Sequence, residues 1–176
     1  MSLPGQNTKF YETPNHPFQG ERIAEEHGLA GRYGLKNKEE LWKAQSELRN
    51  YRREARELLG QTQGDTELAT ERGSQFLARL KRIGILSEDD SLDDVLSLDV
   101  NDVLERRLQT VAYRKGLGHT PKQARQFIVH GHVTVAGSRV TTPSAKVSVA
   151  DEDSVAFDET SPLADDLHPE RSEDQQ

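Results

Sequence analysis

Apolar residues in the first half of the chain recur at intervals of three and four positions, which is the spacing of an amphipathic helix. Between residues 38 and 59 this pattern predicts one long helix, with Asn37 as its N-cap and Gly60 as its end. A second helix is predicted over residues 65–83, ending before Gly84. It would pack on the apolar face of the first, which is expected to hold Leu41, Trp42, Ala44, Leu48, Tyr51, Ala55, Leu58 and Leu59.

The segment after Gly84 contains two motifs that start helices. Ser91 stands three residues before Asp94, and Asp99 stands three before Asp102, which is the spacing of a capping box. Another helix is predicted over residues 102–117. Its inner face would hold Leu104, Leu108, Val111 and Ala112, and its outer face Arg106, Arg107, Arg114 and Lys115.

The next pattern predicts a helix, a turn and a strand. Thr120 is suited to cap the helix, Pro121 to its first position and Gln123 to the reciprocal capping role. The inner face would be Ala124, Phe127 and Ile128, and the outer face Lys122, Arg125 and Gln126. After Gly131, strands are predicted at residues 132–135, 146–149 and 154–157, which together would form a small antiparallel sheet.

These elements predict an α+β fold in four regions. Residues 1–36, rich in proline and glycine, are expected to form an extended arm with a short helix near residues 21–27. Residues 37–102 are predicted to be a helical domain, and residues 103–158 a module of helices and a twisted antiparallel hairpin sheet. Residues 159–176 have the composition of a disordered acidic tail.

Charge is distributed unevenly along these regions. The chain carries a net charge of −7, yet residues 103–149 contain eight Lys or Arg against one Asp or Glu. Such a basic segment is typical of a nucleic-acid surface, because phosphate contacts supply much of the affinity there. Acidic residues elsewhere are typical of proteins that stay soluble in concentrated salt, where charges are strongly screened, and they indicate a salt-loving source.

Other chemistry finds little support in the sequence. The chain has no cysteine, which excludes disulfides, thiolate zinc sites and cysteine nucleophiles. No apolar run is long enough to cross a bilayer, so a soluble cytoplasmic protein is expected. His119, His130 and His132 lie near one another in sequence, but the lack of cysteines and neighbouring carboxylates argues against a metal site. For His130 and His132 a nucleic-acid-contacting or structural role is favoured instead. No cofactor is expected.

The run from Glu105 to Val135, followed by residues 143–149, closely resembles the S4 RNA-binding domain. Beyond this module, residues 33–45, 55–58, 77–86 and 104–110 resemble the archaeal and eukaryotic branch of the small-subunit ribosomal protein S4 family. The resemblance covers about residues 9–157. Two departures are the absence of an N-terminal cysteine zinc knuckle and the presence of Ala136 where the family often has asparagine in the hairpin.

The resemblance implies a non-enzymatic constituent of the small ribosomal subunit. Such a protein binds the 5′ domain of 16S rRNA, nucleates assembly of the subunit body and contributes to translational accuracy. The implied partners are this rRNA and neighbouring ribosomal proteins, among them the S5 family protein. Arginine suits phosphate contacts, and the candidate RNA-binding residues are Arg106, Arg107, Arg114, Lys115, Lys122, Arg125, His130, His132, Arg139 and Lys146 in the module, and Lys43, Arg49, Arg52, Arg53 and Arg56 on the long helix.

Three other classes of protein are alternatives to this interpretation. A helical protein–protein adaptor is one of them, and it would leave the one-sided charge of residues 103–149 unexplained. A nonribosomal RNA-processing factor could carry the same module, but residues 36–45 and 82–86 match the ribosomal family and argue against it. An enzyme such as a pseudouridine synthase would need a catalytic domain, and residues 1–101 contain no recognisable nucleophile, phosphate loop or metal cluster. Trp42 is expected in the core, with stacking on an RNA base as the alternative role.

Overall fold

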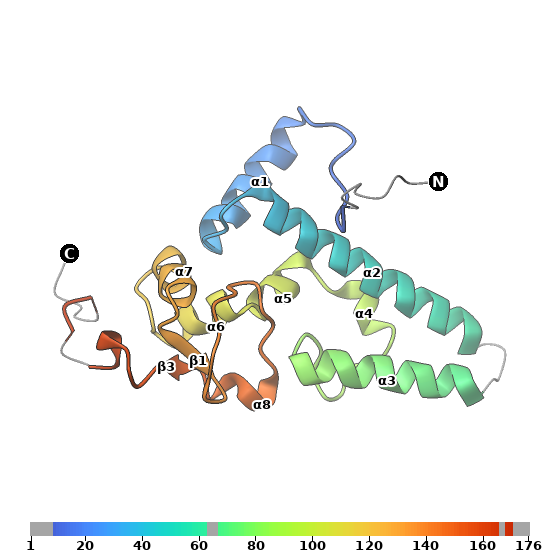
Figure 1. Ribbon diagram of the computed structural model, residues 1–176. Coiled ribbons are helices and arrows are strands. Elements are labelled where there is room, and N and C mark those ends of the chain that lie inside the picture. Colours follow the sequence, from blue (N-terminus) through green and yellow to red (C-terminus); the bar gives the residue numbers. More distant parts are fainter. Residues whose placement is uncertain (1–8, 63–66, 166–167, 171–176) are drawn as a thin grey trace, which may run out of the picture.

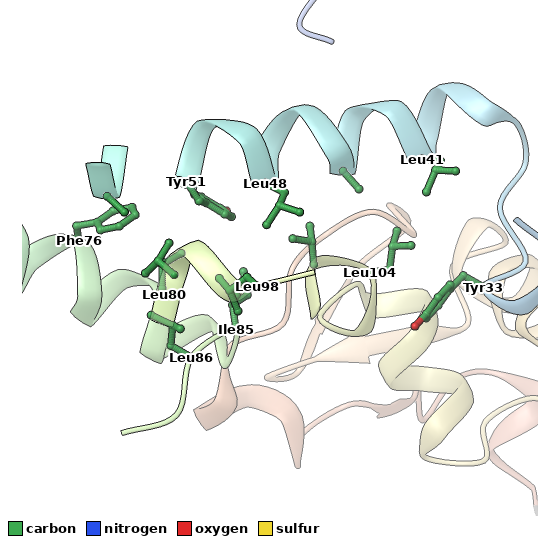
Figure 2. Close-up of a cluster of buried hydrophobic side chains, with 14 of the residues drawn as sticks. Tyr33, Leu41, Leu48, Tyr51, Phe76, Leu80, Ile85, Leu86, Leu98 and Leu104 are labelled. Carbon is green, nitrogen blue, oxygen red and sulfur yellow. The ribbon is translucent and has the colours of Figure 1, made fainter. Parts of the chain in front are cut away.

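The longest elements form a helical hairpin that carries the first hydrophobic core. The computed structural model describes residues 9–62, 67–165 and 168–170. Helices α2 (Lys38–Thr62) and α3 (Glu67–Ile83) lie side by side, and α1 (Gly20–Arg32) packs near the start of α2 (Figure 1). The apolar face of α2 turns toward α3 and the segments that follow it, as Figure 2 shows for Leu41, Leu48 and Tyr51.

The predicted start of α2 is confirmed, whereas its predicted end is wrong. The side-chain oxygen of Asn37 accepts a hydrogen bond of 3.2 Å from the amide of Glu40. The helix then continues through Gly60 to Thr62. A single glycine costs a helix only about 1 kcal/mol relative to alanine, and Gly60 was therefore too weak a signal to end a helix already formed.

Residues 102–117 form two helices, which corrects the prediction of one. These are α5 (Val100–Glu105) and α6 (Leu108–Arg114), separated by Arg106 and by Arg107 with an extended backbone. At the break, Leu108 donates its amide hydrogen to Ala145 (2.7 Å) and Val147 donates to Arg106 (3.1 Å). Short helix α4 (Asp94–Ser97) precedes α5, whose predicted capping box between Asp99 and Asp102 is confirmed.

The second half of the chain contains α7 (Pro121–Val129) and a small antiparallel sheet. Its strands are β1 (Val133–Val135), β2 (Ser138–Arg139) and β3 (Ala156–Phe157), in the order β2-β1-β3. The turn between β1 and β2 has positive φ at Ala136 (49°) and Gly137 (74°), as in a tight hairpin turn. The predicted strand at 146–149 is wrong, because Ser148 there caps helix α8 (Val149–Glu152).

The buried apolar residues form two clusters, one from each half of the chain. One draws on residues between Tyr33 and Leu104, and the other on residues between Leu108 and Leu163. Leu163 is 5% exposed and lies in a 3-10 helix, η1 (Pro162–Ala164). Residues 159–165 thus differ from the structureless tail expected there, because Leu163 completes the second core. The rest of the predicted tail, residues 166–167 and 171–176, lies outside the described residues. Among the described helices, none is long and apolar enough to span a membrane.

Candidate RNA-binding surface

Two arginines, one at the N-cap of α6 and one on α7, meet a carboxylate from α2. Glu40 accepts a 2.8 Å hydrogen bond from Nη2 of Arg107. It also accepts two from Arg125, at 3.1 Å from Nη1 and 2.6 Å from Nη2. Burial alone would raise the pKa of Glu40, but the hydrogen bonds and charges of Arg125 and Arg107 outweigh it and hold this pKa below its ordinary value. Glu40 therefore stays ionised between two arginines.

Gln109 adds further hydrogen bonds to the contact between Glu40 and the two arginines. Its buried Nε2 lies within hydrogen-bonding distance of three carbonyl oxygens, those of Tyr33 (3.0 Å), Gly34 (2.9 Å) and Pro121 (2.9 Å), and its Oε1 accepts from Arg125 (3.1 Å). We call Glu40, Arg107, Gln109 and Arg125 the junction network. It joins the turn after α1, the first turn of α2, the start of α6 and α7.

The outward orientation expected for Arg107 and Arg125 is wrong. The side chain of Arg107 is 6% exposed and that of Arg125 is 20% exposed. The physical reason is Glu40, which packs against both arginines from a different part of the chain. Arg106 is also turned inward: its side chain is 14% exposed, and it donates to Glu152 at 2.9 Å and to the carbonyl of Val147 at 3.1 Å.

Lys146 and Arg52 likewise make internal contacts. Lys146 forms an ion pair with Glu47 and lies 5.5 Å from the ring centre of Tyr51. Burial lowers the pKa of Lys146, and Glu47 opposes that shift. Arg52 donates to the carbonyl oxygen of Leu98. Sequence reasoning missed these acidic partners, although Glu40 and Glu47 are seven positions apart and hence on one face of α2.

Helix α7 begins at Thr120 and Pro121 as the sequence predicts, although Gln123 accepts from the amide of His119 and not from that of Thr120 as a reciprocal cap would. The helix presents Lys122 to solvent. Thr120 Oγ1 accepts from the amide of Gln123 (3.1 Å), while Gln123 Oε1 accepts from the amide of His119 (2.7 Å). Ala124, Phe127 and Ile128 are buried as predicted. Lys122 is exposed, and among the described residues its side chain has no hydrogen-bonding or ionic partner.

A small pocket beside this helix start holds two further arginines. Arg32 and Arg114 line it together with Tyr33, Glu105, Thr110, Tyr113 and Pro121. The Arg114 side chain is 62% exposed and pairs with Glu105 at 2.8 Å. Burial, followed by a hydrogen bond to Glu105, raises the pKa of Tyr33 to about 12. Arg32 was not among the predicted residues; its place two positions before Gly34, whose turn packs on Pro121, brings it to this site.

The remaining predicted residues of the module are spread over its surface. Lys115 pairs with Asp153 at 3.5 Å, and the Arg139 side chain, 56% exposed, pairs with Asp158 at 2.9 Å. Hydrogen bonds from Thr160, and then Arg139, lower the pKa of Asp158 to about 2. His130 is exposed, whereas Nδ1 of His132 lies 2.9 Å from Ser161 Oγ.

The acidic C-terminal segment reaches the start of α7. Gln123 Nε2 donates to Glu170 Oε2 at 3.1 Å, and His119 Nε2 lies 3.1 Å from the carbonyl oxygen of Glu170. This places a carboxylate near the N-terminus of α7, where the helix dipole favours negative charge. No described group of three or more His, Asp or Glu residues is arranged to hold a metal ion.

A second basic surface runs along α2. Arg49, Arg53 and Arg56 are exposed on it, and the residues 9–12 of the arm cross this helix. Lys43 lies 5.6 Å from the ring centre of Tyr11. Trp42, expected in the core, is half-buried: its Nε1 donates to Glu26 at 3.1 Å, and its ring stacks on Tyr11 at 6.4 Å. Trp42 thus joins α1, α2 and the arm.

Comparison with known proteins identifies the class and then the family. Residues 106–153 match the family model of the S4 domain, and they span the break after α5, helices α6 and α7, and the hairpin. The chain is 77% identical to small ribosomal subunit protein uS4 of Natronomonas pharaonis over 97% of its own length and 98% of the relative's.

Other similar proteins carry the same name. The uS4 proteins of Halobacterium salinarum strain R1 and Methanococcus maripaludis strain C6 are 70% and 53% identical, and each alignment covers 98% of this chain and 98% and 96% of the relative. The chain therefore belongs to the small ribosomal subunit protein uS4 family. The resemblance inferred from the sequence is confirmed.

Proposed function

We propose that this chain is a structural constituent of the small ribosomal subunit and a primary binder of its rRNA. The observation that carries the proposal is the 77% identity, over nearly the full length of both chains, with a protein named for that subunit. We infer further that it binds the 5′ domain of 16S rRNA, nucleates assembly of the subunit body and contributes to translational accuracy. The neighbouring proteins would include the S5 family protein, on cytoplasmic ribosomes.

The contacts of the basic residues support two different roles for them, RNA binding and stabilisation of the fold. We infer that RNA phosphates are bound by the exposed ones: Lys122, Arg114, Lys115, Arg139 and His130 in the module, together with Arg32, and Lys43, Arg49, Arg53 and Arg56 along α2. Arg106, Arg107, Arg125, Lys146 and Arg52 instead hold the fold in the shape that presents this surface, and His132 positions the tail through Ser161.

We infer that the internal cations also hold the two units of the chain, residues 37–102 and residues 103–158, in a fixed arrangement. Residues 37–102 supply the α2 surface and residues 103–158 the surface around α7, and the junction network lies between them. Structured RNA is recognised mainly through shape and backbone, which requires a rigid arrangement of cations. A nonribosomal RNA-processing role is not favoured, because the similarity runs through both units.

A binding experiment tests the proposal. The purified full chain is mixed with a transcript of the 5′ domain of small-subunit rRNA and, separately, with tRNA, at one fixed salt concentration. The proposal expects retention of the 5′ domain at concentrations where tRNA passes through, and no chemical change in the bound RNA. Equal affinity for both RNAs, or modified nucleosides detected by mass spectrometry, would contradict it.

A further inference from the structure

A groove between the arm and α2 combines cations with an exposed aromatic ring. Its lining includes Lys9 and Phe10 from the arm, and Arg49, Arg53 and Arg56 from α2. We call this the arm groove. The three arginines are spaced at i, i+4 and i+7, and hence lie along one side of the helix over about 10 Å. A row of guanidinium groups of this length can follow the backbone of a nucleic-acid strand.

The arm is held against α2 by the two residues that follow Phe10, and not by Phe10 itself. Tyr11 stacks on Trp42, and the amide of Glu12 donates to Ser46 Oγ at 3.0 Å. Phe10 is 90% exposed, so its ring contributes little to the folded core. An apolar ring that is left in water at the edge of a basic groove, next to residues held against α2, is available for contact with a ligand.

The charges in the arm groove favour an anionic ligand. Among the described residues that line it, the one carboxylate is that of Glu12, which already lies 3.3 Å from Arg49 Nε. Arg53 donates to Asn50 at 3.0 Å, and the Arg56 side chain has no partner among the residues that the structure describes. Arg53 and Arg56 therefore have guanidinium N–H groups that can donate to phosphate oxygens.

We propose that the arm groove binds an unpaired stretch of RNA, with one base stacked on the ring of Phe10 and the adjoining phosphates on Arg53 and Arg56. This inference rests on the proposed RNA-binding function and adds the kind of RNA that is bound. Every base has a face that stacks on an aromatic ring, but in a duplex those faces are covered by neighbouring bases. The groove thus distinguishes unpaired from paired RNA without reading its sequence.

The experiment compares Phe10→Ala with Phe18→Ala, a matched control that removes an equally exposed ring, 94% exposed, outside the arm groove. Affinities of the full chain for oligoadenylate, and for the same strand paired with oligouridylate, are measured by fluorescence anisotropy. Loss of one base stack should weaken binding of the single strand about fivefold or more in Phe10→Ala. Duplex binding should not change, Phe10→Trp should restore the affinity, and Phe18→Ala should alter neither.

The outcomes separate this inference from the proposed function. The stacking site is refuted if Phe10→Ala weakens the binding of single strand and duplex equally, or if it weakens the binding of neither. This conclusion does not depend on whether the wild-type chain retains the 5′ domain transcript. The second result would be expected if the ring contacted a neighbouring protein instead. Melting curves of all variants accompany the binding data, and a changed melting temperature in Phe10→Ala would also contradict a ring that the fold does not use.

Discussion

Glu40 in α2 accepts hydrogen bonds from both terminal nitrogens of Arg125 in α7, although the two residues are 85 positions apart in the chain. Arg107 completes the contact from the start of α6. The carboxylate and Arg125 are each about one-fifth exposed, at 18% and 20% of the side chain. Through this contact, two arginines of the most basic segment join α7 and the start of α6 to α2.

Arg125→Glu is therefore expected to destabilise the fold. The substitution would place a second carboxylate beside Glu40 and leave Arg107 to neutralise both. Breaking a buried ion pair by removing one partner costs about 3 kcal/mol or more. Urea unfolding followed by circular dichroism measures the change.

Lys122→Glu is the matched control for this measurement, since Lys122 lies on the same helix but is exposed. Its free energy of unfolding should stay within about 0.5 kcal/mol of the wild type. Equal unfolding midpoints for Arg125→Glu and wild type would show that the junction network does not hold the two units together.

Acid should weaken the junction network. The pKa of Glu40 lies below its ordinary value of 4.5 in the folded protein. The folded state thus binds this proton less tightly than the unfolded chain, so the ion pair stabilises the fold fully above about pH 4.5 and loses this contribution as the pH falls through the folded pKa.

The measurement compares wild type with Glu40→Gln between pH 7 and pH 3. Glu40→Gln should be less stable at pH 7, and the difference in unfolding free energy should shrink as the solution becomes acidic. Other carboxyl groups, such as Asp158, titrate in both proteins and cancel in the difference. A difference that stays constant down to pH 3 would show that Glu40 is not the group responsible.

Phe127 should matter for stability and not directly for RNA binding. Its ring is 6% exposed and meets Phe157 edge-on at 5.8 Å between ring centres, which ties α7 to β3. Phe127→Ala should cost about 3 to 5 kcal/mol. Thermal melting checks this, with Val129→Ala, 51% exposed on the same helix, as the control that should change little. Similar melting temperatures for the two variants would place Phe127 outside the second core.

Local signals in the sequence predicted much of this fold. Thr120 and Pro121 specify the start of α7, Asp99 and Asp102 that of α5, and the apolar spacing of α2 identifies its buried face, because each signal acts within one or two turns of backbone. The break between α5 and α6 could not be read this way. It depends on a hydrogen bond that Leu108 donates to Ala145 and on one that Arg106 accepts from Val147, and helical periodicity gives no information about such distant partners.

The contacts of the candidate RNA-binding residues could not be predicted, for the same reason. Sequence alone identified the basic segment but not the partners of its residues, since a lysine or arginine looks the same whether it faces solvent, as Lys122 does, or a distant carboxylate, as Arg125 does. Net charge by segment located the most basic part of the chain. Only the tertiary contacts of Glu40 and Glu47 divided it into internal and exposed cations.

The salt dependence of binding to the 5′ domain transcript tests the central claim, that exposed cations bind RNA and internal ones hold the fold. Affinities of wild type, Lys122→Ala and Lys146→Met are measured over a range of salt concentrations. For wild type, the logarithm of the affinity should fall linearly with the logarithm of the salt concentration. Lys122→Ala should reduce the magnitude of that slope by about 0.7 to 1, the contribution of one phosphate contact. Lys146→Met, which removes a cation paired with Glu47, should leave the slope of the folded protein unchanged. A slope reduced by Lys146→Met and unaffected by Lys122→Ala would contradict the account.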